Sequence, residues 1–340
     1  MNFFENVIKE QTSFLLEDDD KNIQVEKFNI AYGADKNFLF GTGVSIVSVL
    51  LNNKDTNFHF HVFADFLSEK DIRLFGEISS LYNTCVTLYT LNIDSLKKLP
   101  TSQLWSYAMY FRLIIADYFY NKCDKVLYLD SDVVCAGSIN ELEKLDLAYV
   151  PVAAVMDISE SHSIEKANLF NVKGIKEGYL NSGVMLINTK EWRLRKLTEK
   201  SISVFTDEKL RLAITYYDQD AINIAVAGDW LKLDNKFNYR INLNDKYKYR
   251  DSGDFSSAIL IHFIGLTKPW HDWSKYCNEV DCFLNAKEKS PWKNIELMPP
   301  KNIMHYKYAS KHLKYNKKYA SSLFHYFIYT TLKIKNKMKI

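Results

Sequence analysis

Two carboxylates separated by one small residue, Asp130-Ser131-Asp132, stand at the end of the apolar run KVLYLD. Short acidic side chains held close together supply the hard oxygen ligands that Mg²⁺ or Mn²⁺ prefers, and such an ion can bridge to the phosphates of a nucleotide. Asp and Ser are also common in ordinary turns. The strand predicted before the triplet and the apolar Val133-Val134 after it would restrict both acids to a sheet edge, which favours a metal site.

A second group of candidate residues follows the apolar segment AILIHF. His262 could complete a metal site through a ring nitrogen. Gly265 would let the backbone approach a ligand closely, and Lys268 would place a positive charge on a diphosphate. A histidine in a strand is more often a hydrogen-bonded structural residue, so this segment alone leaves both interpretations open.

Two polar clusters could contact a sugar, and one arginine could contact a phosphate. Asn181 and Ser182 lie in GYLNSGVMLIN, and Asp218-Gln219 precede a periodic apolar stretch. Amide and small polar groups can hydrogen-bond sugar hydroxyls, whereas the alternatives are a turn for the first pair and a helix N-cap for Asp218. Arg112, in YFRLIIADYF, is either a snorkelling helix residue or a phosphate clamp suited to its fork geometry.

The elements that must position these residues alternate between strand and helix. Hydrophobic spacing predicts strands over 28–32, 58–65, 85–91 and 125–130, with helices up to about residue 51, over 67–81 and over 107–120. Such alternation is typical of an α/β fold with a mainly parallel sheet, which binds ligands at the carboxyl ends of its strands. Asp35, just after the first strand, and Asp130, at the end of the fourth, both fall there.

Charge is distributed unevenly along the 340 residues. The net charge is +3, but residues 301–340 contain ten Lys and no Arg, Asp or Glu, which leaves 34 basic against 41 acidic residues in the rest of the chain. Lys interleaved with Tyr, Phe, Leu and Ile favours an anionic membrane surface, at about 1 kcal/mol per Lys. A solvated basic helix is the alternative. Nothing resembles a module that reads RNA or DNA, so we do not expect nucleic acid as a partner.

Targeting signals are not apparent in the sequence. Acidic residues stand where a signal peptide needs a basic segment, and no apolar run reaches the roughly 20 residues of a spanning helix. The five cysteines are odd in number and scattered, which favours free thiols in a reducing compartment. We therefore expect a cytoplasmic protein.

Taken together and in this order, six segments resemble glycosyltransferase family 8. They are IAYGADKNF (30–38), YFRLIIADYF (110–119), KVLYLDSDVV (125–134), GYLNSGVMLIN (178–188), DQDAIN (218–223) and HFIGLTKPWHDW (262–273). The resemblance implies a retaining enzyme that uses a UDP-sugar and a divalent metal. It also implies a single GT-A domain, Rossmann-like with a mainly parallel sheet, followed by a small helical basic C-terminal region. The expected boundaries are an N-terminal extension over 1–27, the GT-A domain over 28–275 and the membrane-associating region over 276–340.

Three segments are more narrowly similar to bacterial enzymes that add glucose or galactose to the lipopolysaccharide outer core. They are WSYAMYFRLIIADYF (105–119), TKPWHDW (267–273) and SPWKN (290–294). This implies transfer of an α-hexose from UDP-glucose or UDP-galactose at the cytoplasmic face of the inner membrane. Another glycan acceptor is an alternative, and so is a sugar nucleotidyltransferase, although the single Gly and the Asp of YGADKNF suit uracil better than a triphosphate.

The resemblance also implies roles for individual positions. Asp130, Asp132 and His262 would be the metal ligands, and Gln219 would face the reactive carbon, with Asp218 as the alternative nucleophile. The implied donor contacts are Gly33, Ala34, Asp35 and Asn37 for the uridine and ribose pocket, Ser131 beside the ribose, Arg112, Asn181, Ser182 and Asp218 for the sugar, and Gly265 and Lys268 for the diphosphate. Gly33 stands where some members have alanine, which we expect to matter little for uracil binding.

Overall fold

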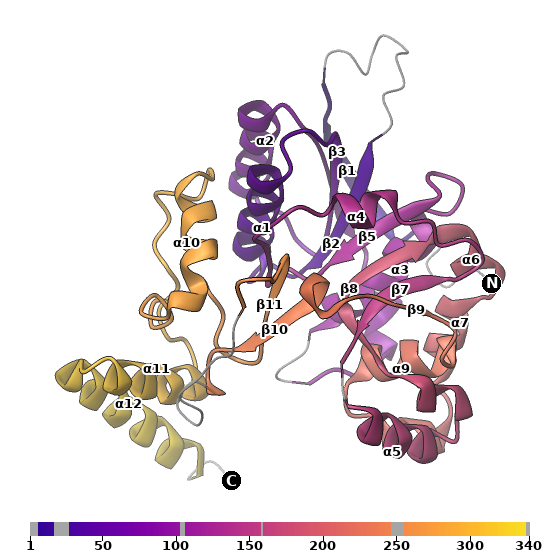
Figure 1. Cartoon of the computed structure of the whole chain (residues 1–340). Coiled ribbons are helices and arrows are strands. Elements are labelled where there is room, and N and C mark those ends of the chain that lie inside the picture. The colour runs from indigo at the N-terminus through magenta and orange to yellow at the C-terminus, as the bar shows by residue number, and fades with distance from the viewer. Residues whose placement is uncertain (1–5, 17–26, 103–105, 158, 246–254, 338–340) are drawn as a thin grey trace.

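A single large sheet forms the centre of the protein. The computed structural model describes residues 6–16, 27–102, 106–157, 159–245 and 255–337 (Figure 1). The sheet has eight strands in the order β1-β4-β3-β2-β5-β8-β7-β9. Their bounds are β1 (Ile8–Phe14), β2 (Phe28–Ala34), β3 (Phe58–Ala64), β4 (Cys85–Leu91), β5 (Lys125–Leu129), β7 (Val152–Met156), β8 (Leu180–Asn188) and β9 (Leu231–Lys232).

The strand directions confirm a mainly parallel sheet. The four neighbours β4, β3, β2 and β5 run parallel to one another, and β9 is parallel to β7. Two strands run the opposite way: β1 beside β4 at one edge, and β8 between β5 and β7. The four strands predicted from hydrophobic spacing correspond to β2, β3, β4 and β5.

Helices cover both faces of this sheet, because its strands are apolar on both sides. On β2, Ile30 and Tyr32 pack into the core beneath α1 (Leu39–Asn52) and α2 (Glu69–Tyr82), whereas Ala31 packs on the opposite face. The opposite face is covered by α3 (Phe111–Tyr118), which a short 3₁₀ turn precedes, and by α6 (Thr189–Leu194), α7 (Leu197–Ser203) and α9 (Tyr217–Val226).

The sequence predicted the positions of the helices more accurately than the residues at which they begin and end. Helix α2 begins at Glu69 because Ser68 and Asp71 form a reciprocal capping box. Asp218 is not the N-cap that was considered as an alternative to a functional role, since α9 begins at Tyr217 and places Asp218 inside its first turn. The remaining outer helices are α4 (Asn140–Lys144), α5 (Glu160–Phe170) and α8 (Glu208–Ala213).

A second, three-stranded sheet links distant parts of the chain. Its order is β10 (Tyr239–Asn242), β11 (Leu260–Ile264) and β6 (Val133–Cys135), with β11 parallel to β10 and antiparallel to β6. Strand β6 directly follows Asp130-Ser131-Asp132. The small sheet therefore brings the segment around His262 beside the end of β5.

The first 27 residues contribute one strand to the large sheet. Of residues 1–27, expected to form an extension, Ile8–Phe14 form the edge strand β1, and Phe14 packs against the backbone of Gly76 in α2. Residues 1–5 and 17–26 of that segment, like Trp105 of the family motif, lie outside the described residues.

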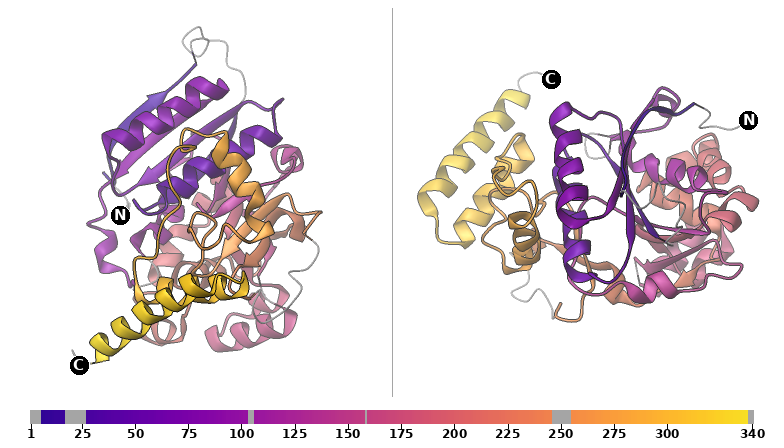
Figure 2. Two further views of the ribbon diagram at one scale, coloured as in Figure 1. Left: turned by 90° about the vertical axis from the view of Figure 1, so that its left-hand side faces the viewer. Right: turned by 90° about the horizontal axis from the view of Figure 1, so that it is seen from above.

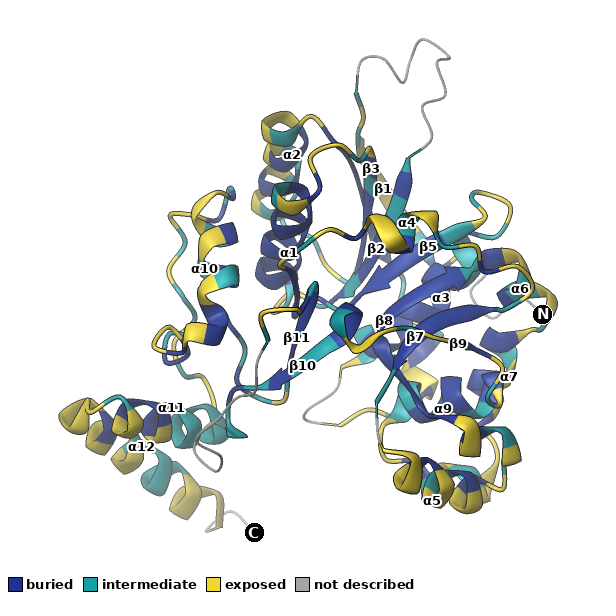
Figure 3. Ribbon diagram, in the orientation of Figure 1, coloured by how far each residue is buried: buried dark blue, intermediate teal, exposed yellow. Residues whose placement is uncertain are grey.

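The expected helical C-terminal region is confirmed. Helix α10 (Asp281–Glu288) packs on α1, and α11 (Ile303–Tyr315) and α12 (Tyr319–Lys337) form a pair beyond it (Figure 2). Of the residues of α12 that the structure describes, Ser322 alone is buried, so most of this helix faces solvent (Figure 3). Within the described ranges, no helix combines the length and the apolar character needed to cross a bilayer.

Candidate metal and donor site

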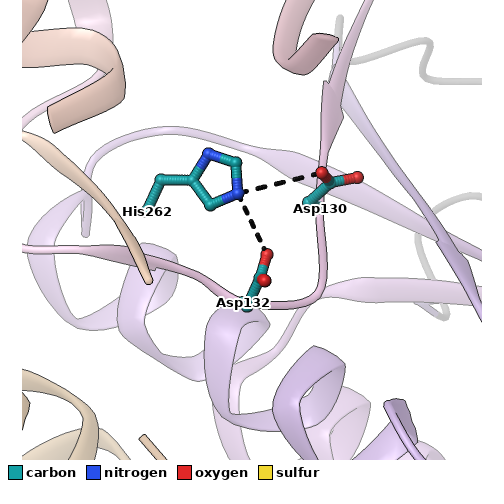
Figure 4. A group of neighbouring side chains, drawn as sticks. All are labelled: Asp130, Asp132 and His262. Atoms are coloured by element: carbon teal, nitrogen blue, oxygen red, sulfur yellow. Dashed lines mark ion pairs between the residues drawn. The ribbon is translucent and has the colours of Figure 1, made fainter. Parts of the chain in front are cut away.

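Three side chains from two separate elements converge beside the carboxyl end of β5 (Figure 4). Asp130 follows β5 directly, Asp132 comes two residues later, and β11 places His262 opposite Val133. His262 Nε2 lies 3.3 Å from Asp132 Oδ1 and 3.9 Å from Asp130 Oδ2. One ligand atom from each residue lies within 4.8 Å of the other two. The structure thus brings together the three residues expected as metal ligands.

Each of the two carboxylates directs one oxygen toward His262, and a basic side chain binds its other oxygen. Arg112 Nη2 donates a hydrogen bond to Asp130 Oδ1 at 2.8 Å, and Lys268 Nζ donates to Asp132 Oδ2 at 2.5 Å. The remaining oxygens, Asp130 Oδ2 and Asp132 Oδ1, are the ones that face His262. Both carboxylates are therefore oriented before any ligand binds.

Asp132 is held in its ionised form. Burial alone would raise the pKa of this carboxyl, but the charge of Lys268, the neighbouring His262 and the hydrogen bonds from both bring the pKa well below its usual range. A carboxylate must be ionised to ligate a cation. The surroundings of Asp132 therefore favour metal binding at neutral pH.

A chain of amide groups determines the tautomer of His262. The backbone N–H of Gly183 donates to Asn181 Oδ1 at 3.0 Å, so the same oxygen accepts the 2.7 Å bond from Asn238 Nδ2. Asn238 then presents its oxygen to His262 Nδ1, 3.0 Å away, and that nitrogen must carry the proton. With the proton on Nδ1, Nε2 is the nitrogen left to ligate a metal, and it is the one that faces the carboxylates.

Two residues of this arrangement had no assigned role in the sequence. A Cβ at Gly183 would lie 2.3 Å from His262 Cε1 and 2.8 Å from Asp130 Oδ2, so only glycine leaves room for the site. The NSG segment was a signal for Gly183. Asn238 carried no such signal, because its segment NKFNYR has no strand or helix periodicity, and it reaches the site only through the fold.

The three side chains fit a divalent cation such as Mg²⁺ or Mn²⁺. Two carboxylate oxygens and an imidazole nitrogen converge, and the carboxylate oxygens are ligands that these ions prefer. Three protein ligands also leave coordination positions for phosphate oxygens or water.

Arg112 is buried and ties three segments together. Its Nε lies 3.1 Å from Asp218 Oδ2, and its Nη1 donates to the Ser182 carbonyl at 2.7 Å. The guanidinium lies 4.8 Å from the centre of the Tyr128 ring, whose hydroxyl donates to Asp130 Oδ1 at 2.7 Å. Arg112 is therefore not a snorkelling residue. Its guanidinium contacts both Asp130 and Asp218 and so fixes the positions of the two carboxylates relative to each other.

Asp218 and Gln219 present different chemistry at the start of α9. Burial raises the pKa of Asp218 to about 6, although the charge of Arg112 opposes this. Gln219 Oε1 accepts from the Ser182 N–H at 3.1 Å, and its Nε2 donates to Asp157 Oδ2 at 2.7 Å. These two bonds fix which end of the Gln219 amide is the oxygen.

The residues expected around uridine lie at the end of β2. Asp35 accepts from the backbone N–H of Asn37 at 2.8 Å and from the Ser106 hydroxyl at 2.7 Å, which holds the turn. Asn37 is exposed, and Ala34 is buried as the last residue of β2. The turn therefore lies at the same sheet edge as Asp130, as predicted.

Gly33 has a packing role that the sequence did not indicate. A Cβ at this position would lie 2.7 Å from Phe111 Cβ and 3.4 Å from the carbonyl oxygen of Ala108. Since Phe111 is the first residue of α3 and is fully buried, alanine would push this helix away from β2. Whatever its effect on uracil, alanine is therefore a poor fit here.

Ser131, Asn181 and Gly265 complete the predicted set. The Ser131 hydroxyl accepts from Thr42 of α1 at 2.8 Å, so it packs α1 against the site. Asn181 is occupied by the amide chain described above and by a 3.1 Å bond to Asp157. Gly265 has a φ of +83°, a conformation that favours glycine, in the loop that returns Lys268 toward Asp132.

Comparisons with known proteins identify the family of this chain. Residues 29–274 match the model of "Glycosyl transferase family 8", and residues 280–333 match "Glycosyl transferase family 8 C-terminal". The chain is 41% identical over 313 residues to the lipopolysaccharide 1,3-galactosyltransferase of Salmonella typhimurium, covering 91% of this chain and 92% of that protein. It is 37% identical over 338 residues to the lipopolysaccharide glucosyltransferase WaaO of Escherichia coli, covering 98% of this chain and 100% of that protein.

A solved structure supports the same conclusion. The crystal structure of the galactosyltransferase LgtC, in complex with donor and acceptor sugar analogues, superposes with a TM-score of 0.65 at 25% identity, covering 77% of this chain and 96% of LgtC. The expected GT-A fold is therefore confirmed. With family models matched over most of its length, the chain belongs to glycosyl transferase family 8.

Proposed function

We propose that this glycosyltransferase moves an α-linked glucose or galactose from a UDP-sugar to the lipopolysaccharide outer core, with retention of configuration and with a divalent metal. The observation that carries the proposal is the convergence of Asp130, Asp132 and His262, whose outer atoms are already held by Arg112, Lys268 and an amide chain. The similar proteins named above, which act on lipopolysaccharide, support the choice of acceptor.

A cation held there would act as a Lewis acid on the diphosphate of the donor. The residues of the chain then have separate tasks. Asp130, Asp132 and His262 would hold the ion, and Lys268, 13% exposed, would add a fixed positive charge beside Asp132. Preorganised charges of this kind stabilise a departing phosphate because they need not reorganise during the reaction.

On the sugar side, we favour attack from the face of the leaving group. Gln219 is an amide and a poor nucleophile, and its hydrogen bonds to Ser182 and Asp157 hold it in place as an electrostatic support for the reacting carbon. The carboxylate of Asp218 is the alternative nucleophile, as in retaining glycosidases. Its Oδ2 lies 3.1 Å from Arg112, which lowers its nucleophilicity.

A donor screen tests this proposal. UDP release from UDP-glucose and UDP-galactose is measured with Mg²⁺, with Mn²⁺ and after metal chelation, with and without purified core oligosaccharide. We expect release that depends on both metal and donor, and faster release with acceptor. Lack of metal-dependent release or transfer with either donor would contradict the proposal. Release of pyrophosphate from a nucleoside triphosphate would instead indicate a nucleotidyltransferase.

A separate test concerns the reaction course. The variant Gln219→Ala should transfer more slowly but keep some activity, because the metal site does not depend on it. Mass spectrometry of the protein during turnover should detect no sugar adduct. A covalent hexose on Asp218 or Gln219 would refute attack from the leaving-group face.

We also propose that α12 attaches the enzyme to the cytoplasmic face of the inner membrane. This helix exposes Leu323, Phe324 and Phe327, each more than 60% accessible, and ends in Lys333, Lys335 and Lys337. Exposed aromatic residues suit the headgroup region of a bilayer, and Lys residues suit its anionic lipids. Removal of residues 317–340 should abolish salt-sensitive binding to vesicles that contain phosphatidylglycerol. Unchanged binding would refute the proposal.

A further inference from the structure

The loop that carries Lys268 lies against the C-terminal helical pair. This loop, residues 265–273, leaves β11 at Gly265, and Lys268 returns toward Asp132. We call it the Lys268 loop. Its backbone is folded back on itself, since the Lys268 N–H donates to His271 Nδ1 at 3.0 Å and the His271 N–H donates to the Lys268 carbonyl at 3.1 Å.

One side of the Lys268 loop stacks on α11. The ring of His271 lies parallel to that of Trp273, with centres 4.2 Å apart and an interplanar angle of 27°. His305, in the first turn of α11, contacts both: its ring centre is 4.7 Å from His271 and 5.3 Å from Trp273. His271 and Trp273 are both buried. Together with His305 they form a cluster of three rings between the Lys268 loop and α11.

His271 has the chemistry needed to hold Lys268 in this position. Burial, the nearby His305 and the charge of Lys268 lower the pKa of His271 to about 2, so the ring stays neutral and Nδ1 remains an acceptor. The bond from the Lys268 N–H therefore persists across the physiological pH range.

The other side of the loop is linked to α11 through Asn244. The Thr267 hydroxyl accepts from Trp273 Nε1 at 3.1 Å and donates to Asn244 Oδ1 at 2.7 Å. His312 Nε2 lies 3.4 Å from the same oxygen of Asn244, and His312 is fully buried.

Both contacts come from one face of one helix. His305 and His312 are seven residues apart, which is two turns of α11. The helix is itself held by α12, where the Ser322 hydroxyl donates to the Ser310 carbonyl at 2.8 Å. The route from the exposed helix α12 to Lys268 therefore consists of direct contacts throughout.

We propose that α11 is a positioning element of the donor site, in which His305 and His312 hold the Lys268 loop so that Lys268 can meet the diphosphate. Neither histidine touches the donor in this assignment. It rests on the proposed function, because it takes a nucleoside diphosphate as the group that Lys268 meets. It goes further, because the C-terminal helices become part of the binding machinery as well as a membrane anchor.

The experiment compares three variants in the full-length chain. His305→Ala removes the ring that closes the cluster, His305→Phe keeps a ring able to stack, and Tyr308→Ala removes a ring on the same helix that contacts Lys307 and Lys311. Two quantities are measured: amide hydrogen exchange in residues 265–273, without ligand, and the affinity for UDP with Mn²⁺, by calorimetry.

We expect His305→Ala to speed exchange in the Lys268 loop and to weaken UDP binding about two- to tenfold, the size of one aromatic contact. The KM for the UDP-hexose should rise more than kcat falls, and His305→Phe and Tyr308→Ala should resemble the wild type. Unchanged exchange would overturn the inference, and so would faster exchange with unchanged UDP affinity. If the wild type itself bound no UDP, the proposed function would fail, whereas wild-type binding that His305→Ala leaves intact would overturn only the role of α11.

Discussion

The metal site and helix α12 are opposite kinds of surface in one molecule. At the metal site, Asp132 and His262 are buried, and each polar atom described above has a partner or faces the point of convergence. On α12, Phe324 and Phe327 are 62% and 69% exposed. A set of buried polar groups is costly unless it is satisfied, and exposed aromatic residues on a basic helix need a partner outside the chain. The hydrogen bonds of the first surface favour rigidity, and the exposure of the second is the basis for the membrane attachment proposed above.

The largest effect should come from Asp132→Asn. The substitution removes one ligand and the partner of Lys268, and a metal contributes several kcal/mol to stabilisation of the departing phosphate. We expect kcat/KM for UDP-hexose to fall by about three orders of magnitude, with vesicle binding unchanged. Initial rates across a Mn²⁺ titration measure the first quantity, and sedimentation with vesicles measures the second.

Asp94→Asn is the matched control for that substitution. Asp94 forms an exposed ion pair with Lys97 at 2.7 Å, far along the chain from the metal site. Its loss should leave the rate within about twofold, since exposed pairs contribute little. Equal losses in the two variants would mean that Asp132 acts through general charge or stability and not as a ligand.

A smaller effect is expected from Asn238→Ala. The variant keeps all three ligands but removes the group that holds the proton of His262 on Nδ1. Loss of a group that hydrogen-bonds a metal-ligating histidine typically weakens metal affinity by 10- to 100-fold, so we expect the apparent affinity for Mn²⁺ to fall by about that factor. Calorimetric Mn²⁺ titration in the presence of UDP measures it.

Asn53→Ala separates this effect from a loss of stability. Asn53 is also buried, and its amide bonds the backbone of Val49 and Ile139, away from the three ligands. Both variants should unfold more easily, because each leaves buried partners unsatisfied. Only Asn238→Ala should weaken Mn²⁺ binding, and similar metal affinities in the two would show that Asn238 has a structural role only.

The sequence predicted those parts of the site that periodicity and spacing encode. The strand before Asp130 and the turn at Asp35 were predicted because short apolar runs and turn residues mark strand ends. The α/β class followed from the same alternation. The motifs around Asp130 and His262 were grouped through their resemblance to a family, since no local pattern reveals that β11 pairs with β6.

The remainder depended on contacts between distant segments. Asn238 and Gly183 meet His262 only because the pairing of β11 with β6 brings His262 beside the end of β5. The interior position of Arg112 was likewise hidden, since helical spacing does not distinguish a side chain that snorkels from one that bridges two carboxylates. The strand β1 was missed because residues 9–13 are all polar, as suits a strand at an edge of the sheet, and so lack the apolar spacing of a strand.

Gly33→Ala should have a moderate effect on stability. The added Cβ would lie 2.7 Å from Phe111 Cβ, and overpacking of a core of this kind costs about 1 to 3 kcal/mol. Gly137→Ala is the control, because its Cβ would meet Ile259 at 3.4 Å, an ordinary contact. The free energies of unfolding, from denaturant titrations, should separate the two variants. Equal values would show that α3 moves to admit the methyl group without cost.

The double variant Phe324→Ser with Phe327→Ser should have the smallest effect on catalysis. Its effect on membrane binding should be large. Both rings are exposed, so their loss leaves the core intact, and transfer to a small oligosaccharide acceptor should stay within about twofold. Burying a phenylalanine in an apolar environment is worth about 1.5 to 3 kcal/mol, so binding to phosphatidylglycerol vesicles should weaken at least tenfold. A control with Leu81→Ser and Leu212→Ser, which removes two equally exposed apolar residues outside α12, should bind vesicles normally. Normal vesicle binding by the α12 variant would mean that the Lys residues alone attach the helix. The exposed aromatic residues of α12 would then have no role in membrane binding.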